Sequence, residues 1–216
     1  AIEEGRGIFH NIRKFVIYLL SCNLAEVLIV FFGVIILQDL VLTATMLLWI
    51  NVVTDGIPAV ALGLDPAEKG IMRYSPRVFQ TQIVSMRLWT EMIVFGIFLS
   101  VFVLGAYMIN LSQGMQSAQS AAFTSLVVFE LISIYLIRSR YKVSFFSNKW
   151  LLISIIATLG LQLLIVYLPF FNTLFGIAPL DLNDWIFMIL ASIWLYFAFQ
   201  LIQIALDAIP AFKENK

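Results

Sequence analysis

The sequence LVLTATMLLWINVVTDGIPAVALGL, residues 40–64, decides the class of fold. It is long and apolar enough to cross a bilayer as a helix, which needs about 20 such residues. Asn51, Thr54 and Asp55 nevertheless lie within it, at the spacing i, i+3, i+4 that puts three side chains on one face of a helix. An ionisable residue at mid-membrane costs about 2.5–3.5 kcal/mol on insertion scales. The stretch therefore predicts a membrane helix with a functional polar face.

The same stretch predicts an interruption of this helix directly after Asp55, where Gly56 and Pro58 follow. Proline removes a helical hydrogen bond, and glycine lowers the cost of leaving the helical conformation. A break here would turn backbone carbonyl oxygens toward the polar face, as in the discontinuous helices of ion-coupled transporters.

Composition places the whole chain in the membrane class. Of its 216 residues 62% are hydrophobic and 12% are charged, whereas soluble domains are about half apolar and a quarter charged. The formal net charge is zero, so no nucleic-acid partner is expected. Because the chain has one cysteine, Cys22, and one histidine, His10, we expect neither a disulfide framework nor a site for a soft metal ion.

The apolar segments predict an all-α membrane protein of six transmembrane helices, forming a single domain over residues 1–216. The fourth segment is the shortest and contains Glu130. The six predicted spans are Phe15–Leu37, Leu40–Leu64, Leu88–Ile109, Ala121–Ile137, Trp150–Phe171 and Trp185–Leu206.

The basic residues predict the orientation of these spans. All 13 lysines and arginines lie before the first span or after the second, fourth and sixth. Under the positive-inside rule both termini are then cytoplasmic, and residues 65–87 form an ordered cytoplasmic loop. We expect a multi-pass protein of the plasma membrane in a prokaryote, or of an endomembrane in a eukaryote.

Three carboxylates are predicted to lie near mid-depth: Glu26 in the first span, Asp55 in the second and Glu130 in the fourth. No lysine or arginine occurs at comparable depth, so these groups must be protonated or bound to cations. Asn23, three residues before Glu26, adds an amide to the same helical face. Carboxylate, amide and hydroxyl oxygens are the ligands of a hard cation such as Ca²⁺.

Short motifs around this region resemble the P-type Ca²⁺-transporting ATPases. Residues 47–59, LLWINVVTDGIPA, resemble the sixth transmembrane helix of that family. Residues 3–6 (EEGR) and 21–26 (SCNLAE) are similar to its fifth helix, and residues 61–66 (ALGLDP) and 71–72 (IM) to the loop after the sixth. The resemblance is specific over residues 1–77 and implies that the six spans are the family's fifth to tenth helices.

The resemblance implies roles for individual residues. The positions that match ligands of the family's first Ca²⁺ site are Asn23, Glu26, Thr54, Asp55 and Glu130. Asn51 and Asp55 match ligands of the second site, so Asp55 would bridge both. This pattern is that of the two-site, sarco/endoplasmic-reticulum-like branch, which bacterial relatives share.

The family's phosphorylation motif, Asp-Lys-Thr-Gly-Thr, does not occur in this sequence. We therefore expect the C-terminal membrane portion of a pump, inactive as an ATPase by itself, on which ATP and Mg²⁺ act only through cytoplasmic domains outside the sequence. Its expected partners are the lipid bilayer, the pump's remaining helices and those domains, which Asp65 and Glu68 are predicted to contact.

Two other interpretations stay open. One is the membrane domain of a P-type pump for Na⁺, H⁺ or Mn²⁺, because a set of oxygen ligands alone does not distinguish well between these ions and Ca²⁺. The other is a free-standing cation carrier or a regulatory membrane protein.

Overall fold

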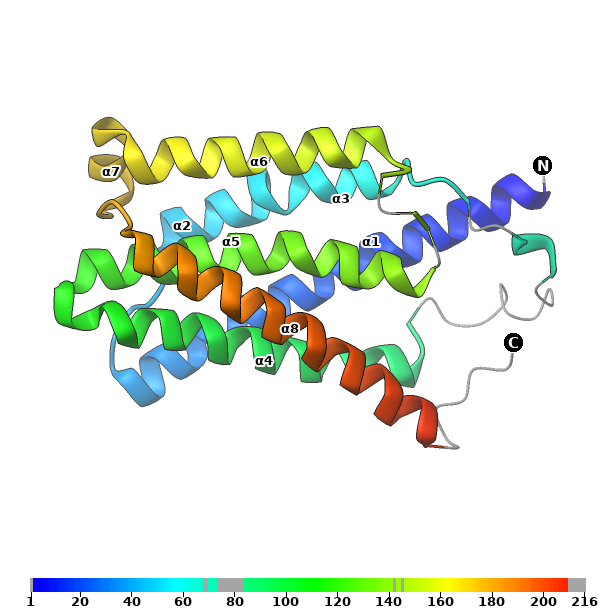
Figure 1. Cartoon of the computed structure of the whole chain (residues 1–216), viewed down its shortest axis with the longest axis horizontal. Coiled ribbons are helices and arrows are strands. Elements are labelled where there is room, and N and C mark those ends of the chain that lie inside the picture. Colours follow the sequence, from blue (N-terminus) through cyan, green and yellow to red (C-terminus); the bar gives the residue numbers. More distant parts are fainter. Residues whose placement is uncertain (1, 68–69, 74–83, 142, 145, 210–216) are drawn as a thin grey trace.

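A computed structural model describes residues 2–67, 70–73, 84–141, 143–144 and 146–209. This part of the chain folds into helices and contains no strand (Figure 1). The elements are α1 (Ile2–Phe32), η1 (Gly33–Leu37), α2 (Ala44–Trp49), η2 (Ile50–Thr54), α3 (Gly56–Leu62), η3 (Ile71–Arg73), α4 (Met86–Asn110), η5 (Leu111–Gln113), α5 (Met115–Arg140), α6 (Lys149–Tyr167), α7 (Pro169–Phe175) and α8 (Leu182–Ala208).

Six helical segments of the described chain are long and apolar enough to cross a membrane. They comprise α1 with η1, α2 to α3, α4 with η5, α5, α6 and α8. The prediction of an all-α fold with six spans is therefore confirmed. The start of α1 and the end of α8 lie at the same end of the bundle (Figure 1). That this end is cytoplasmic remains a prediction from the basic residues.

Helix α5 is the centre of the bundle and packs against α1, α4, α6 and α8. In its most apolar 18-residue window 83% of the residues are buried. The N-terminal half of α5 allows this close packing because it is rich in small residues, namely Ala118, Ser120, Ala121, Ala122 and Ser125. Small side chains let membrane helices approach each other closely. Glu130 on α5 is thereby held in the interior.

Several helices differ in length from the predicted spans. Helix α1 begins at Ile2, well before the apolar stretch that starts at Phe15. Helix α5 also extends beyond its predicted span at both ends. The predicted fifth span is wrong at its C-terminal end, because α6 stops at Tyr167 and Pro169 starts the separate helix α7. A proline fits the first helical position, where its missing N–H needs no partner.

The predicted cytoplasmic loop, residues 65–87, is described only in part, and residues 68–69 and 74–83 lie outside the described chain. Within the described part, the short helix η3 is held to α1 by Arg6, whose Nη1 donates a hydrogen bond to the carbonyl of Ile71 at 3.2 Å. The predictions for Glu68 therefore also lie outside the described residues.

Candidate functional site

The second membrane segment is interrupted in its middle, as the sequence predicts, but at a different position. Between α2 and α3 the chain forms the π-helical turn η2, in which the N–H of Asp55 bonds to the carbonyl of Ile50 at 2.8 Å. The break thus lies before Asp55 and not after it. Pro58 explains the shift, because a proline ring clashes with the carbonyl four residues earlier, that of Thr54, and supplies no N–H to it. Such π turns occur frequently at functional sites.

Asp55, at the junction of η2 and α3, is completely buried. Its Oδ1 accepts a hydrogen bond from the Tyr18 hydroxyl of α1 at 2.8 Å. Glu130 of α5 faces the same point, and one of its carboxylate oxygens lies within 4.8 Å of an Asp55 oxygen. Two carboxylates from different helices therefore meet inside the bundle.

Glu26 and Asn51 form the second half of the cluster. The Asn51 Nδ2 of η2 donates to Glu26 Oε2 of α1 at 2.7 Å and to the carbonyl of Leu47 at 3.0 Å. Glu26 is buried, whereas Asn51 is exposed at the surface of the bundle. The predicted pairing of polar faces on the first two spans is present at this contact.

Thr54 and Asn23 are placed differently from each other. Thr54 is buried, and its hydroxyl donates to the carbonyl of Ile50 at 3.1 Å, which leaves its oxygen beside the π turn. Asn23 is exposed, and its amide nitrogen bonds to the carbonyl of Leu19 on its own helix. The structure therefore brings Asp55 and Glu130 together and places Asn51 in contact with Glu26. It buries Thr54 next to Asp55 in the chain and leaves Asn23 on the outer face. The ligand role of each residue remains a prediction.

Among the residues that the structure describes, four oxygens of the buried carboxylates have no hydrogen-bond partner: Glu26 Oε1, Asp55 Oδ2, Glu130 Oε1 and Glu130 Oε2. An ionised carboxylate in an apolar interior is costly unless a proton or a cation neutralises it. Ca²⁺ accepts six to eight oxygens in flexible geometry, so oxygens of this kind suit it. The geometry fits a cation site that draws on α1, η2 and α5.

Two residues of the site were missed by sequence reasoning. The Sγ of Cys22 lies within 4.8 Å of oxygens of both Asp55 and Glu130, although the sequence analysis did not include Cys22 among the site residues. Tyr18 was not among the predicted site residues, although its hydroxyl donates a hydrogen bond to Asp55. The signal was present, because Tyr18, Cys22 and Glu26 follow one another at intervals of four and thus form one stripe along α1.

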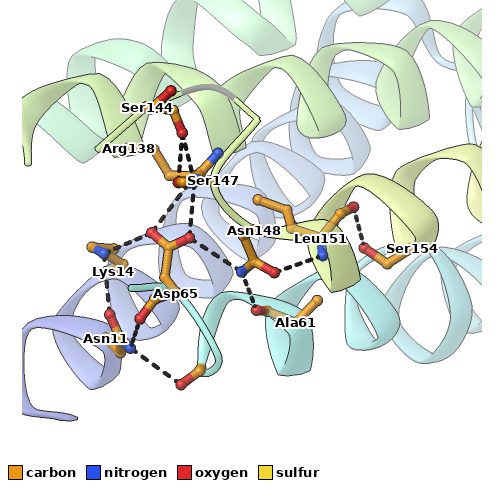
Figure 2. A network of polar contacts seen from close by, with 11 residues as sticks. Asn11, Lys14, Ala61, Asp65, Arg138, Ser144, Ser147, Asn148, Leu151 and Ser154 are labelled. Carbon is orange, nitrogen blue, oxygen red and sulfur yellow. Dashed lines mark hydrogen bonds and ion pairs between the residues drawn. The ribbon is translucent and has the colours of Figure 1, made fainter. Parts of the chain in front are cut away.

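A second polar cluster lies at the end of the bundle that contains the start of α1 and the end of α8, and it is centred on Asp65 (Figure 2). The Asp65 carboxylate, whose side chain is 0% exposed, accepts from Lys14 Nζ at 2.7 Å. It also accepts from Arg138 Nη2 at 2.9 Å and Nε at 3.1 Å, and from Asn148 Nδ2 at 3.1 Å. The Asp65 side chain is thus enclosed by its own chain, and the contact of its loop with a cytoplasmic domain remains a prediction.

The Asp65 network ties four parts of the chain together. Asn11 of α1 donates to the carbonyl of Asp65 at 2.7 Å and to that of Gly63 at 3.2 Å. Asn148 donates to the carbonyl of Ala61 in α3 at 2.8 Å, while its own oxygen caps α6 by accepting from the N–H of Leu151. The segment that carries Asp55 is thereby anchored to α1, α5 and α6 at one end.

A separate group of ion pairs joins α4, α5 and α8 at the same end. Glu91 of α4 accepts from Arg87 at 3.0 Å and pairs with Arg140 of α5. Arg87 also pairs with Asp207 of α8, whose side chain is 66% exposed. These acids have basic partners, which distinguishes them from the carboxylates of the central cluster.

Comparison with known proteins agrees with the sequence resemblance. The chain is 33% identical over 195 residues to a protein named calcium-transporting ATPase of Bacillus subtilis, a match that covers 88% of this chain and 22% of that protein. It is 33% identical over 196 residues to the probable cation-transporting ATPase F of Mycobacterium bovis, covering 86% of this chain and 21% of the relative. It is 27% identical to the calcium-transporting ATPase 4, endoplasmic reticulum-type, of Arabidopsis thaliana, covering 89% of this chain and 24% of the relative.

The chain thus spans between a fifth and a quarter of the length of these curated relatives. Residues 39–205 match the family described as cation transporting ATPase, C-terminus. This range includes the interrupted second segment, Glu130 and the last four spans except the final three residues of α8. The chain therefore belongs to the family of C-terminal membrane regions of cation-transporting P-type ATPases.

Proposed function

We propose that this chain is the cation-binding membrane part of an ATP-driven Ca²⁺ pump. The observation that carries the proposal is the group of four unpartnered carboxylate oxygens of Glu26, Asp55 and Glu130, buried in the middle of a membrane bundle. A transported cation would neutralise these groups when bound, and its release would require a change in their environment.

The ligands would come from both sides of the π turn. Asp55 would be a ligand of both ions, one of them held also by Glu26 and Glu130 and the other also by Asn51. Thr54, whose hydroxyl oxygen lies beside the turn, would add a neutral oxygen ligand. The interruption of the helix supports this role, since irregular backbone at membrane depth is tolerated where it is enclosed by protein or lines a cavity.

The exposed amides of Asn23 and Asn51 support a place within a larger membrane assembly. Both residues lie on the outer face of the bundle beside buried Glu26. An amide that faces lipid loses the hydrogen bonds that water would give, which disfavours such a face. In the proposed pump another membrane helix would cover this face, and Asn23 would complete a site there. ATP and Mg²⁺ would act on cytoplasmic domains of that pump, and the chain alone would hydrolyse no ATP.

Ca²⁺ binding by the purified chain in lipid nanodiscs, measured by isothermal titration calorimetry, tests the proposal. We expect Asp55→Asn and Glu130→Gln to weaken binding by at least about tenfold, since even indirect partners of a metal ion contribute 10–100-fold. The matched control is Asp207→Asn, which removes a charge from an exposed acid outside the cluster and should leave binding unchanged.

Two results would count against the proposal. Ca²⁺ affinity that is unaffected by Asp55→Asn would refute the site assignment. Binding of Na⁺ or Mn²⁺ that requires Asp55, with no binding of Ca²⁺, would support the alternative of a pump for a different ion.

A further inference from the structure

The central cluster contains a sulfur atom besides its oxygens. Cys22 Sγ, one oxygen of Asp55 and one oxygen of Glu130 all lie within 4.8 Å of one another. The three side chains come from α1, from the junction of η2 and α3, and from α5. Their exposures are 1%, 0% and 1% respectively, so each is enclosed by the bundle.

The separation of these three atoms is close to the ligand–ligand separation around one small metal ion. In a tetrahedral zinc site the metal–sulfur distance is about 2.3 Å and the metal–oxygen distance about 2.0–2.2 Å, which separates neighbouring ligand atoms by roughly 3.6 Å. A contraction of about 1 Å from the upper limit of 4.8 Å, within the reach of side-chain rotation, would complete three such contacts.

The oxygens of the cluster supply independent support for a ligand. Both carboxylate oxygens of Glu130 and Oδ2 of Asp55 have no hydrogen-bond partner. Most buried polar atoms are hydrogen-bonded, so groups that are not require an explanation such as an ion. Because the thiol and these oxygens face one another, an ion that enters the cluster meets sulfur as well as oxygen.

We propose that Cys22, Asp55 and Glu130 form a mixed sulfur–oxygen site that binds a thiophilic divalent cation, of the type of Zn²⁺ or Cd²⁺. Sulfur ligands favour such ions over Ca²⁺, which binds almost only oxygen. The inference rests on the proposed function, because Asp55 and Glu130 belong to both sites. The two kinds of ion would therefore compete.

Binding at this site has a defined proton balance. The thiolate is the form of cysteine that binds metal, so the S–H bond of Cys22 breaks as the sulfur–metal bond forms. This proton, and any proton that the Asp55 and Glu130 carboxyl groups carry before the metal binds, passes to solvent. No electron is transferred, and the metal keeps its charge of +2.

Cys22 is the only cysteine of the chain, so any metal–thiolate signal must come from this residue. We would add Cd²⁺ to the purified full chain in nanodiscs and record the ultraviolet charge-transfer band of a cadmium–thiolate bond. X-ray absorption at the zinc edge of the Zn²⁺-loaded chain would show a sulfur neighbour at about 2.3 Å. Neither measurement requires a variant. Their absence in the presence of bound metal would overturn the proposal.

Cys22→Ser replaces the sulfur with a hydroxyl oxygen of similar placement. We expect it to abolish the band and to reduce Cd²⁺ affinity by at least about tenfold, and to change Ca²⁺ affinity less than Cd²⁺ affinity, since Ca²⁺ prefers oxygen ligands. The matched control is Ser21→Ala, a buried neighbour whose hydroxyl bonds only to the Ile17 carbonyl of its own helix, and it should change neither affinity.

The outcomes separate this inference from the proposed function. Equal Cd²⁺ affinity of the unmodified chain and Cys22→Ser, with normal Ca²⁺ binding, would refute the sulfur site alone. A Cys22-dependent cadmium band in a chain that binds no Ca²⁺ would support the sulfur site and refute the proposed Ca²⁺ function. Failure of both ions to bind would refute both.

Discussion

Replacement of Asp65 by asparagine tests how the interrupted segment is held in place. Asparagine keeps the shape of the side chain but removes its negative charge and exchanges one acceptor oxygen for a donor nitrogen. Lys14 and Arg138, whose side chains are 1% and 2% exposed, would then face each other without an anion between them. In the unmodified chain each Asp65 oxygen accepts two hydrogen bonds. Either orientation of the new amide therefore leaves two of these donors without their acceptor oxygen.

The size of the effect follows from this count. A hydrogen bond to a charged group contributes about 1.5–3 kcal/mol, so loss of two gives about 3–6 kcal/mol. In mutational experiments, removal of one member of a buried ion pair costs about 3–5 kcal/mol. The two values agree, and about 4 kcal/mol is a large part of the 5–15 kcal/mol that stabilises a typical folded domain.

Reversible unfolding of the purified chain in mixed micelles, followed by circular dichroism, measures this loss. Asp207→Asn is the control, because its pair with Arg87 is at an exposed side chain and such pairs contribute at most about 1 kcal/mol. Adding Lys14→Met to Asp65→Asn should restore part of the stability, since it removes one of the two buried cations that have lost the negative charge of Asp65. If Asp65→Asn destabilises the chain no more than Asp207→Asn does, the reasoning is wrong.

Two further predictions concern the site and the packing. Tyr18→Phe removes the hydroxyl that bonds to Asp55 at 2.8 Å, and we expect Ca²⁺ affinity in calorimetry to fall by about tenfold, as for other residues that orient a metal ligand; unchanged affinity would refute an orienting role. Gly33→Ala places a methyl group 2.7 Å from Cγ2 of Val41 and should cost about 1–3 kcal/mol in the same unfolding assay. Gly160→Ala meets no atom within 4 Å and should be neutral or stabilising by up to about 1 kcal/mol, so equal effects of the two alanines would contradict the packing argument.

The helices themselves were largely predictable from the sequence. A bilayer requires long apolar helices, and such helices can be recognised from the composition of the chain and the lengths of its apolar segments. The errors occurred where local backbone chemistry overrides hydropathy. Pro169 ends the fifth span early, and Pro58 moves the break of the second segment to the turn before Asp55. Hydropathy alone does not distinguish α-helical from π-helical turns.

The functional importance of the polar residues at mid-depth was equally predictable from the sequence, because a polar residue is costly in lipid. Their mutual contacts were not. The spacing of Asn23 and Glu26 suggested one shared face, but the rotation of α1 buries Glu26 and leaves Asn23 exposed. Conversely, Tyr18 bonds to Asp55 and Cys22 lies within 4.8 Å of it, although neither residue was predicted to belong to the site.

The sequence by itself determined that this protein has six membrane spans with acids in its interior, because membrane insertion selects on hydropathy and charge, which are local properties. Its short motifs separately indicated the resemblance to the cation-transporting ATPases. Only the tertiary structure decided which of these groups meet. The close packing of α1, α4, α6 and α8 around α5, together with the Asp65 ion pairs to α1 and α5 at one end, sets the rotation of each helix about its axis. That rotation turns Asp55, Glu130 and the thiol of Cys22 toward a common point, and it depends on side chains far apart in the chain.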